Sequence, residues 1–87
     1  MTIREEIKVA ALKTLHRLDG DVLKEAHLFE LVRLHPTVAA ATLGDFGVAI
    51  SELQADGFIL GTTGNFLRTR HWGLTPKGTH AAASLGT

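Results

Sequence analysis

Apolar residues recur at three- and four-residue intervals at the start of the chain, which predicts an amphipathic helix from Thr2 to about Leu18. Thr2 and Glu5 have capping-box spacing, at which each side chain can cover the other residue's free backbone N–H. The predicted apolar stripe comprises Ile3, Ile7, Ala10, Ala11, Leu15 and Leu18. The sequence Asp-Gly-Asp at 19–21 should end this helix, because Gly20 suits a left-handed stop.

A second helix is predicted from about Lys24 to His35, preceded by a very short strand at Val22 and Leu23. Its buried side is expected to comprise Leu28, Leu31, Val32 and Leu34. Pro36 ends the helix, because a proline pushes the preceding residue away from helical geometry. Residues 36–41 then form a connector, in which Val38 to Ala41 is an alternative short turn.

The third predicted helix starts at Thr42, whose hydroxyl can cap it, with Asp45 favoured near its positive end. Its core face follows helical spacing and comprises Phe46, Ala49, Ile50 and Leu53. Gly57 ends the helix. Gly44 and Gly47 are costly inside a helix, so we expect another backbone or a ligand to approach there, with tight packing inside the domain as the rival explanation.

Two strands, Phe58 to about Thr62 and Leu67 to Leu74, are predicted to form a hairpin, because the residues between them, Thr63-Gly64-Asn65, suit a tight turn. Strand alternation places Trp72 and Leu74 on one face, with Arg68 and Arg70 further out on that face. Trp72 is expected in the core, with stacking on a base as the less favoured alternative.

A final short helix is predicted from Thr75 to about Leu85, with Thr75 as its cap and Pro76 in its first turn, where a missing N–H costs nothing. The chain therefore reads helix, short strand, helix, helix, hairpin, helix. This order predicts an α+β fold of the winged-helix type: a three-helix bundle with a two- or three-stranded sheet and a short C-terminal helix. All 87 residues belong to one domain.

Composition favours a soluble globular domain, with 45% hydrophobic and 21% charged residues. No apolar run approaches the length of a membrane span, and the charged N-terminal residues do not resemble a secretory signal. We therefore expect a cytoplasmic protein without membrane contact. The chain has no cysteine, which excludes disulfides and thiolate zinc sites.

The charge distribution is uneven although nine basic and nine acidic residues give a net charge of zero. A neutral balance counts against nucleic-acid binding. Residues 57–87 nevertheless contain Arg68, Arg70 and Lys77 and no acid, whereas residues 37–56 contain three acids and no base. The sequence thus predicts a cationic hairpin beside an anionic third helix.

Two motifs carry a family resemblance: Leu53, Gly57, Phe58 and Ile59, then Trp72, Leu74, Thr75 and Gly78. With this spacing the chain resembles the winged-helix transcription regulators of MarR and PadR type, best over residues 42–80. The resemblance implies that the helix 42–56 enters the DNA major groove and that the hairpin 58–74 lies along the backbone or minor groove. Many such proteins dimerise through a long C-terminal helix, which this short ending does not supply, so a homodimer would use another surface such as the first helix.

The candidate DNA-binding residues follow from charge and hydrogen-bonding chemistry, and they are Arg68, Arg70, His71, Lys77, Ser51 and Gln54. The hairpin cations suit phosphate contacts. Ser51 and Gln54 are the natural base readers on the third helix, whose carboxylates Asp45 and Glu52 would repel phosphate. We therefore expect a small regulator that binds double-stranded DNA; the alternative is a protein–protein interaction module that docks a partner through its anionic helix.

The sequence predicts neither a metal site nor a catalytic site among its histidines and carboxylates. The five histidines are His16, His27, His35, His71 and His80. None forms an i, i+4 pair on a helix, and no cysteine assists them. No nucleophile motif or phosphate-binding loop is present, so we expect no enzyme activity, no metal and no cofactor.

Overall fold

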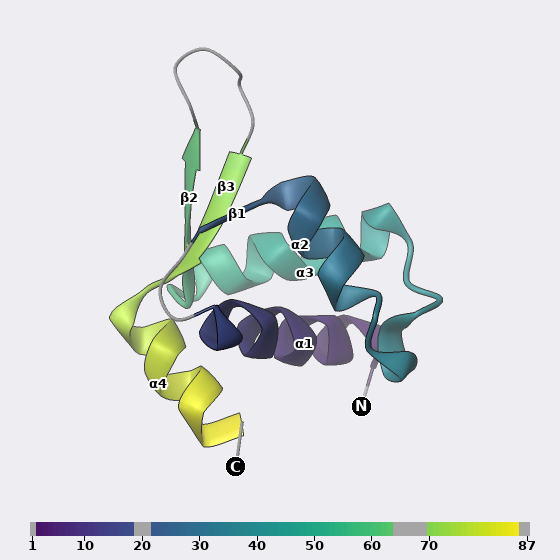
Figure 1. The fold of residues 1–87 in the computed structure, drawn as a ribbon, viewed down its shortest axis with the longest axis horizontal. Coiled ribbons are helices and arrows are strands. Elements are labelled where there is room, and N and C mark those ends of the chain that lie inside the picture. The colour runs from purple at the N-terminus through teal and green to yellow at the C-terminus, as the bar shows by residue number, and fades with distance from the viewer. Residues whose placement is uncertain (1, 19–21, 64–69, 86–87) are drawn as a thin grey trace.

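The computed structural model describes residues 2–18, 22–63 and 70–85 and has an α+β fold (Figure 1). Within these residues it contains four α-helices, one 3-10 helix and a three-stranded antiparallel sheet. The elements are α1 (Ile3–Arg17), β1 (Leu23–Lys24), α2 (Glu25–Val32), η1 (Pro36–Val38), α3 (Leu43–Ala55), β2 (Ile59–Thr63), β3 (Arg70–Leu74) and α4 (Pro76–Leu85). The order of elements agrees with the prediction. The short strand β1 joins the β2–β3 hairpin to complete the three-stranded sheet.

Helix α1 is the centre of the fold, because it packs against α2, α3 and α4. Thr2 caps it by accepting a hydrogen bond from the Glu5 backbone N–H at 3.2 Å. Its core residues are Ile7, Ala10, Ala11, Leu12 and Leu15. The predicted stripe was wrong at its start, where Ile3 is exposed. The predicted stop at 19–21 lies outside the described residues.

Helix α2 is shorter than predicted and buries Leu28 and Val32. The backbone leaves the helix after Val32, and Pro36 starts the 3-10 turn η1 rather than directly ending α2. The prediction for Leu34 was wrong, since 76% of this residue is exposed. Leu34 lies beyond the end of α2, so helical spacing no longer places its side chain on the buried face of the helix.

Helix α3 forms as predicted and is held at both ends. Thr42 and Asp45 make a complete capping box, with N–O distances of 3.1 and 3.3 Å. Its predicted core face is buried throughout and comprises Phe46, Ala49, Ile50 and Leu53. Gly57 follows the helix with φ +82°, a conformation that side chains rarely adopt. This glycine turns the chain directly into β2.

The sheet has the order β1-β3-β2, with all neighbours antiparallel. β2 and β3 form a ribbon that leaves the body beside the end of α3 (Figure 1). Trp72 pairs with Leu23 on one side and Gly61 on the other, and only 1% of it is exposed. A Cβ on Gly61 would lie 2.8 Å from the indole ring. Trp72 is therefore a core residue, as predicted, and cannot stack on a base.

Helix α4 closes the domain against α1 and β3. The Thr75 hydroxyl accepts from the Gly78 N–H at 3.0 Å, which confirms the predicted cap, and donates to the Gly57 carbonyl at 2.6 Å. One side chain thus joins the start of α4 to the end of α3. Over the described parts of the chain, no helix has the length and hydrophobicity needed to cross a bilayer.

Candidate nucleic-acid interface

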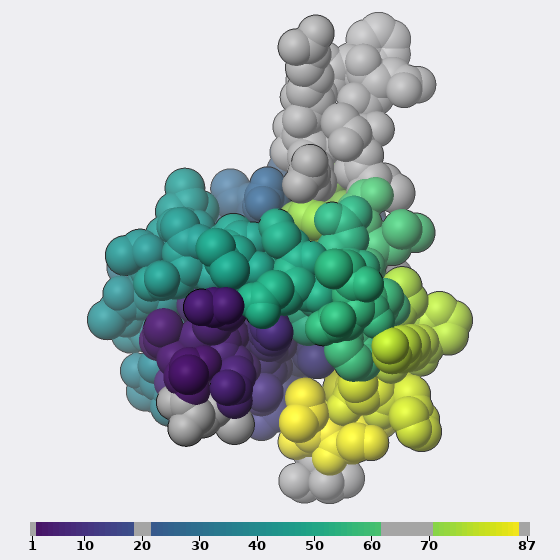
Figure 2. All heavy atoms as spheres, turned by 180° about the vertical axis from the view of Figure 1, so that it is seen from behind, coloured from purple at the N-terminus to yellow at the C-terminus, as the bar shows by residue number. Residues whose placement is uncertain are grey.

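The outer face of α3 is the surface that the sequence predicts to read bases, and Figure 2 shows this segment crossing one side of the molecule in teal to green. Ser51 and Gln54, the predicted base readers, are both exposed on it. Two apolar residues of α3 are also exposed to solvent, Leu43 at 65% and Val48 at 49%. Arg4 lines one rim of a shallow groove along this face. The face is therefore open, but more apolar than a typical DNA-reading helix.

The two glycines of α3 make this face flat. A Cβ on Gly44 would have only an ordinary contact, 3.7 Å from the Thr42 hydroxyl, and a Cβ on Gly47 would meet nothing within 4 Å. Tight packing inside the domain, the rival explanation from the sequence, is therefore wrong for Gly47. Both glycines line the groove together with Val48 and Ser51, so the bare backbone there faces outward.

The acidic side chains of α3 are engaged by neighbours. Glu52 binds Arg4 at 3.2 Å and Lys8 at 3.1 Å, both from α1. The hydrogen bonds from Lys8 and then Arg4 hold the pKa of Glu52 below its ordinary value. Asp45 is used in the helix cap. The anionic character predicted for this helix is thus partly neutralised, which lessens the repulsion that its carboxylates would exert on phosphate.

This clamp between α1 and α3 could not be read from the sequence. Glu52 and its two partners are separated by more than forty residues, and no local spacing rule connects them. The only signal was an amphipathic first helix with cations near its start, which does not say which carboxylate they meet.

Of the predicted hairpin cations, the structure describes the side chain of His71. Alternation along β3 puts His71 on the face of the sheet opposite Trp72, and its backbone pairs with Lys24 of β1 and Thr62 of β2. His71 is half-buried. Arg70 begins β3, but its side chain and the whole of Arg68 lie outside the described part of the structure.

Lys77 has two contacts within the domain. Its ammonium group donates to the Asp56 carbonyl at 2.7 Å and lies 4.7 Å from the centre of the Phe58 ring. A cation at this position is favourable, because the carbonyl ends of α3 carry a partial negative charge. Lys77 thus stabilises the junction of α3, β2 and α4, a role that the sequence did not indicate.

Comparisons of the chain with protein-family models, with curated proteins and with solved structures found no match.

Proposed function

We propose that this protein is a small winged-helix regulator that binds duplex DNA, with α3 as its recognition helix and the β2–β3 ribbon as its wing. The observation that carries the proposal is the placement of α3: one face is buried in the core, the other is open along its length, and the ribbon leaves the body beside its end. A helix open in this way fits the width of the major groove. A projecting ribbon can then follow the adjacent phosphates.

In this proposal Arg68 and Arg70 contact phosphates, and Ser51 and Gln54 reach base edges. The pairing of Glu52 with Arg4 and Lys8 supports the proposal, because it leaves the groove without an isolated carboxylate at that position. Arg4, at 56% side-chain exposure, remains available near the rim. His71 and Lys77 contribute less, since His71 is half-buried and Lys77 donates to the Asp56 carbonyl.

The test is a titration of random-sequence duplex DNA at low and moderate salt, with the double variant Arg68→Ala/Arg70→Ala. We expect measurable binding at low salt that weakens with added salt. Loss of two phosphate contacts should reduce the slope of log affinity against log salt by about two units. The charge-matched control is Lys13→Ala/Arg17→Ala on α1, which should keep the wild-type slope. No binding at low salt, or equal effects of both variants, would contradict the proposal.

A second candidate is a docking module for another protein, favoured by the exposed apolar residues Leu43 and Val48 beside the bare backbone of Gly47. Protein interfaces have apolar centres depleted in charge. Val48→Lys separates the two candidates. A new cation on α3 should strengthen duplex binding if this face meets DNA; it should leave duplex binding unchanged or absent if the face takes a protein.

A further inference from the structure

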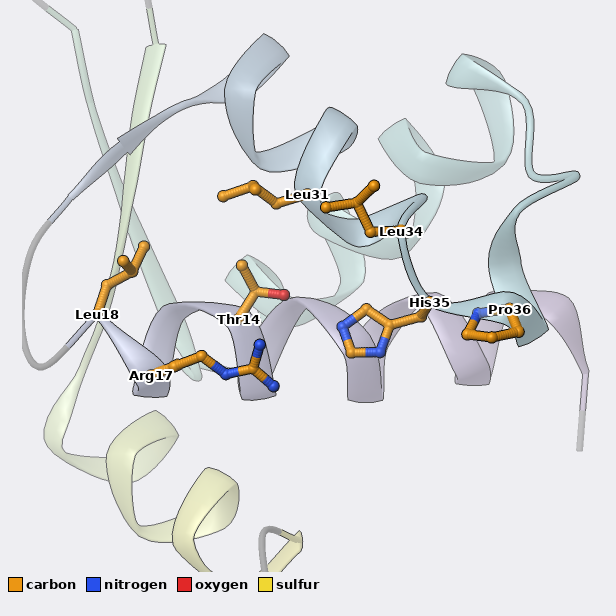
Figure 3. Close-up of a pocket in the computed structure, with 7 residues that line it drawn as sticks. All are labelled: Thr14, Arg17, Leu18, Leu31, Leu34, His35 and Pro36. Atoms are coloured by element: carbon orange, nitrogen blue, oxygen red, sulfur yellow. The ribbon is translucent and has the colours of Figure 1, made fainter.

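A second surface feature, apart from the α3 groove, is a pocket between the C-terminal half of α1 and the end of α2 (Figure 3). Leu31 lies near the end of α2, Leu34 and His35 follow in the connector before η1, and Arg17 is at the end of α1. Its volume is about 280 Å³, just below the range of about 300–1,000 Å³ for sites that hold drug-sized molecules. The pocket therefore fits one small group rather than a peptide segment.

The apolar part of this pocket is left uncovered by the chain. Leu18 and Leu31 are only half-buried, and Leu34 is 76% exposed because it lies past the end of α2. Thr14 lines the same pocket, but its hydroxyl already donates to the Ala10 carbonyl at 2.7 Å. The pocket thus offers an apolar wall with little competing polarity from its floor.

A group of basic side chains adjoins this apolar wall. Lys13, His16 and Arg17 have i, i+3, i+4 spacing on α1, so they share one face, and all three line a second hollow next to the pocket. Lys13 and His35 also line a third hollow, together with Glu6. Arg17 and His35 connect these hollows to the apolar pocket.

The two permanent charges of this group are not neutralised within the described part of the chain. There, the ion pairs are those of Glu52 with Arg4 and Lys8. Asp19 and Asp21, which follow Arg17 in the sequence, lie outside the described residues. Residues 7–18 contain no acid, so the local charge of this half of α1 is positive.

We infer that the pocket and the cationic face beside it bind a small soluble phosphate monoester with an apolar substituent. The phosphoryl group would lie between Lys13 and Arg17, because their two positive charges match its two negative charges. The Arg17 guanidinium can also donate two parallel hydrogen bonds to two phosphate oxygens. The substituent would rest against Leu31 and Leu34. The site shares no side chain with the proposed DNA contacts, so either can fail alone.

Isothermal titration calorimetry of the full chain with phenyl phosphate tests this inference, beside inorganic phosphate and phenol. Each of the latter two fills half of the site, so both should bind at least about tenfold more weakly. Lys13→Ala/Arg17→Ala should weaken phenyl phosphate by about tenfold or more, because two charge-assisted hydrogen bonds are lost. Leu34→Ser should weaken phenyl phosphate and leave inorganic phosphate unchanged.

The control is Lys24→Ala/Arg33→Ala, which removes the same charge from exposed positions that line none of the three hollows. The control variant should bind phenyl phosphate with the affinity of the wild type. Far-UV circular dichroism should show that every variant is folded. Vesicles containing phosphatidic acid test a lipid source for the same phosphate group. The inference is overturned by an absence of saturable binding, by equal affinity for inorganic phosphate, by indifference to the double change, or by binding to the vesicles alone.

Discussion

At the scale of single residues, two helical glycines have opposite surroundings. Gly78 of α4 is buried, and a Cβ there would overlap the carbonyl oxygen of Phe58. That oxygen also accepts the Thr75 N–H, which fixes its position. Gly47 of α3 has open space where its side chain would be. The first glycine is required by packing, and the second is not.

Alanine at these two positions should therefore have opposite effects on the free energy of unfolding. Gly78→Ala should lower it by about 1–3 kcal/mol, because α4 must move away from the Phe58 backbone. Gly47→Ala should raise it by about 0.5–1 kcal/mol, since alanine restricts the unfolded chain and favours the helix. Urea titration of both variants measures the two changes, and a loss of stability at Gly47 would show that its surroundings are not open.

Residues that act on their immediate neighbours in sequence were predictable. Thr42, Gly57 and Thr75 were all assigned correctly from capping and turn chemistry, which acts over three or four residues. Lys77 was predicted only as a DNA-binding residue, because its contact with the Asp56 carbonyl depends on how α4 meets the end of α3. No rule of local spacing contains that information.

At the scale of elements, the clamp of Glu52 by Lys8 and Arg4 should make the contact of α1 with α3 sensitive to acid. Because the pKa of Glu52 is depressed in the folded protein, its contribution is fully present above the ordinary value of 4.5 and is lost as the pH falls through the lower folded pKa. We expect Glu52→Gln to flatten the fall in stability below pH 4.5. Chemical denaturation at a series of pH values measures this.

The matched control for the acid prediction is Glu30→Gln, an exposed carboxylate of α2. It should keep the wild-type slope of stability against pH in that range. Equal slopes for the wild type and Glu52→Gln would show that the clamp does not contribute to folding.

The limits of α2 illustrate why elements are harder to predict than caps. Pro36 was read as the end of a helix that runs to His35, but α2 ends at Val32 and the proline begins η1. A proline disfavours helical geometry at the residue before it; it does not require a helix up to that point. The chain instead leaves the helix at Val32 and buries Val38 of η1 in the core, and tertiary packing of this kind is not a local property.

At the scale of the whole molecule, a single core joins the elements. Buried residues from α1, α2, η1, α3, β2, β3 and α4 form one cluster, and the chain's single tryptophan, Trp72, is among the largest of them. We expect Trp72 fluorescence and far-UV circular dichroism to give the same urea midpoint, because a small domain with one shared core should unfold cooperatively. Two separate midpoints would show that the hairpin and the helices unfold independently.

The α+β architecture was predictable at this scale, whereas the surroundings of His71 were not. The order of helices and strands followed from periodicity and turn residues. The pairing of His71 with Thr62 of β2 and Lys24 of β1 depends on sheet register. Register is determined by contacts between strands that are distant in the sequence.

The unoccupied volume beside Gly47 has a practical consequence, because the chain contains no cysteine. Gly47→Cys would place a unique thiol in the middle of the outer surface of α3. A fluorophore or spin label attached there would report directly on whatever approaches this helix, whether nucleic acid or protein, without removing any side chain that the fold uses.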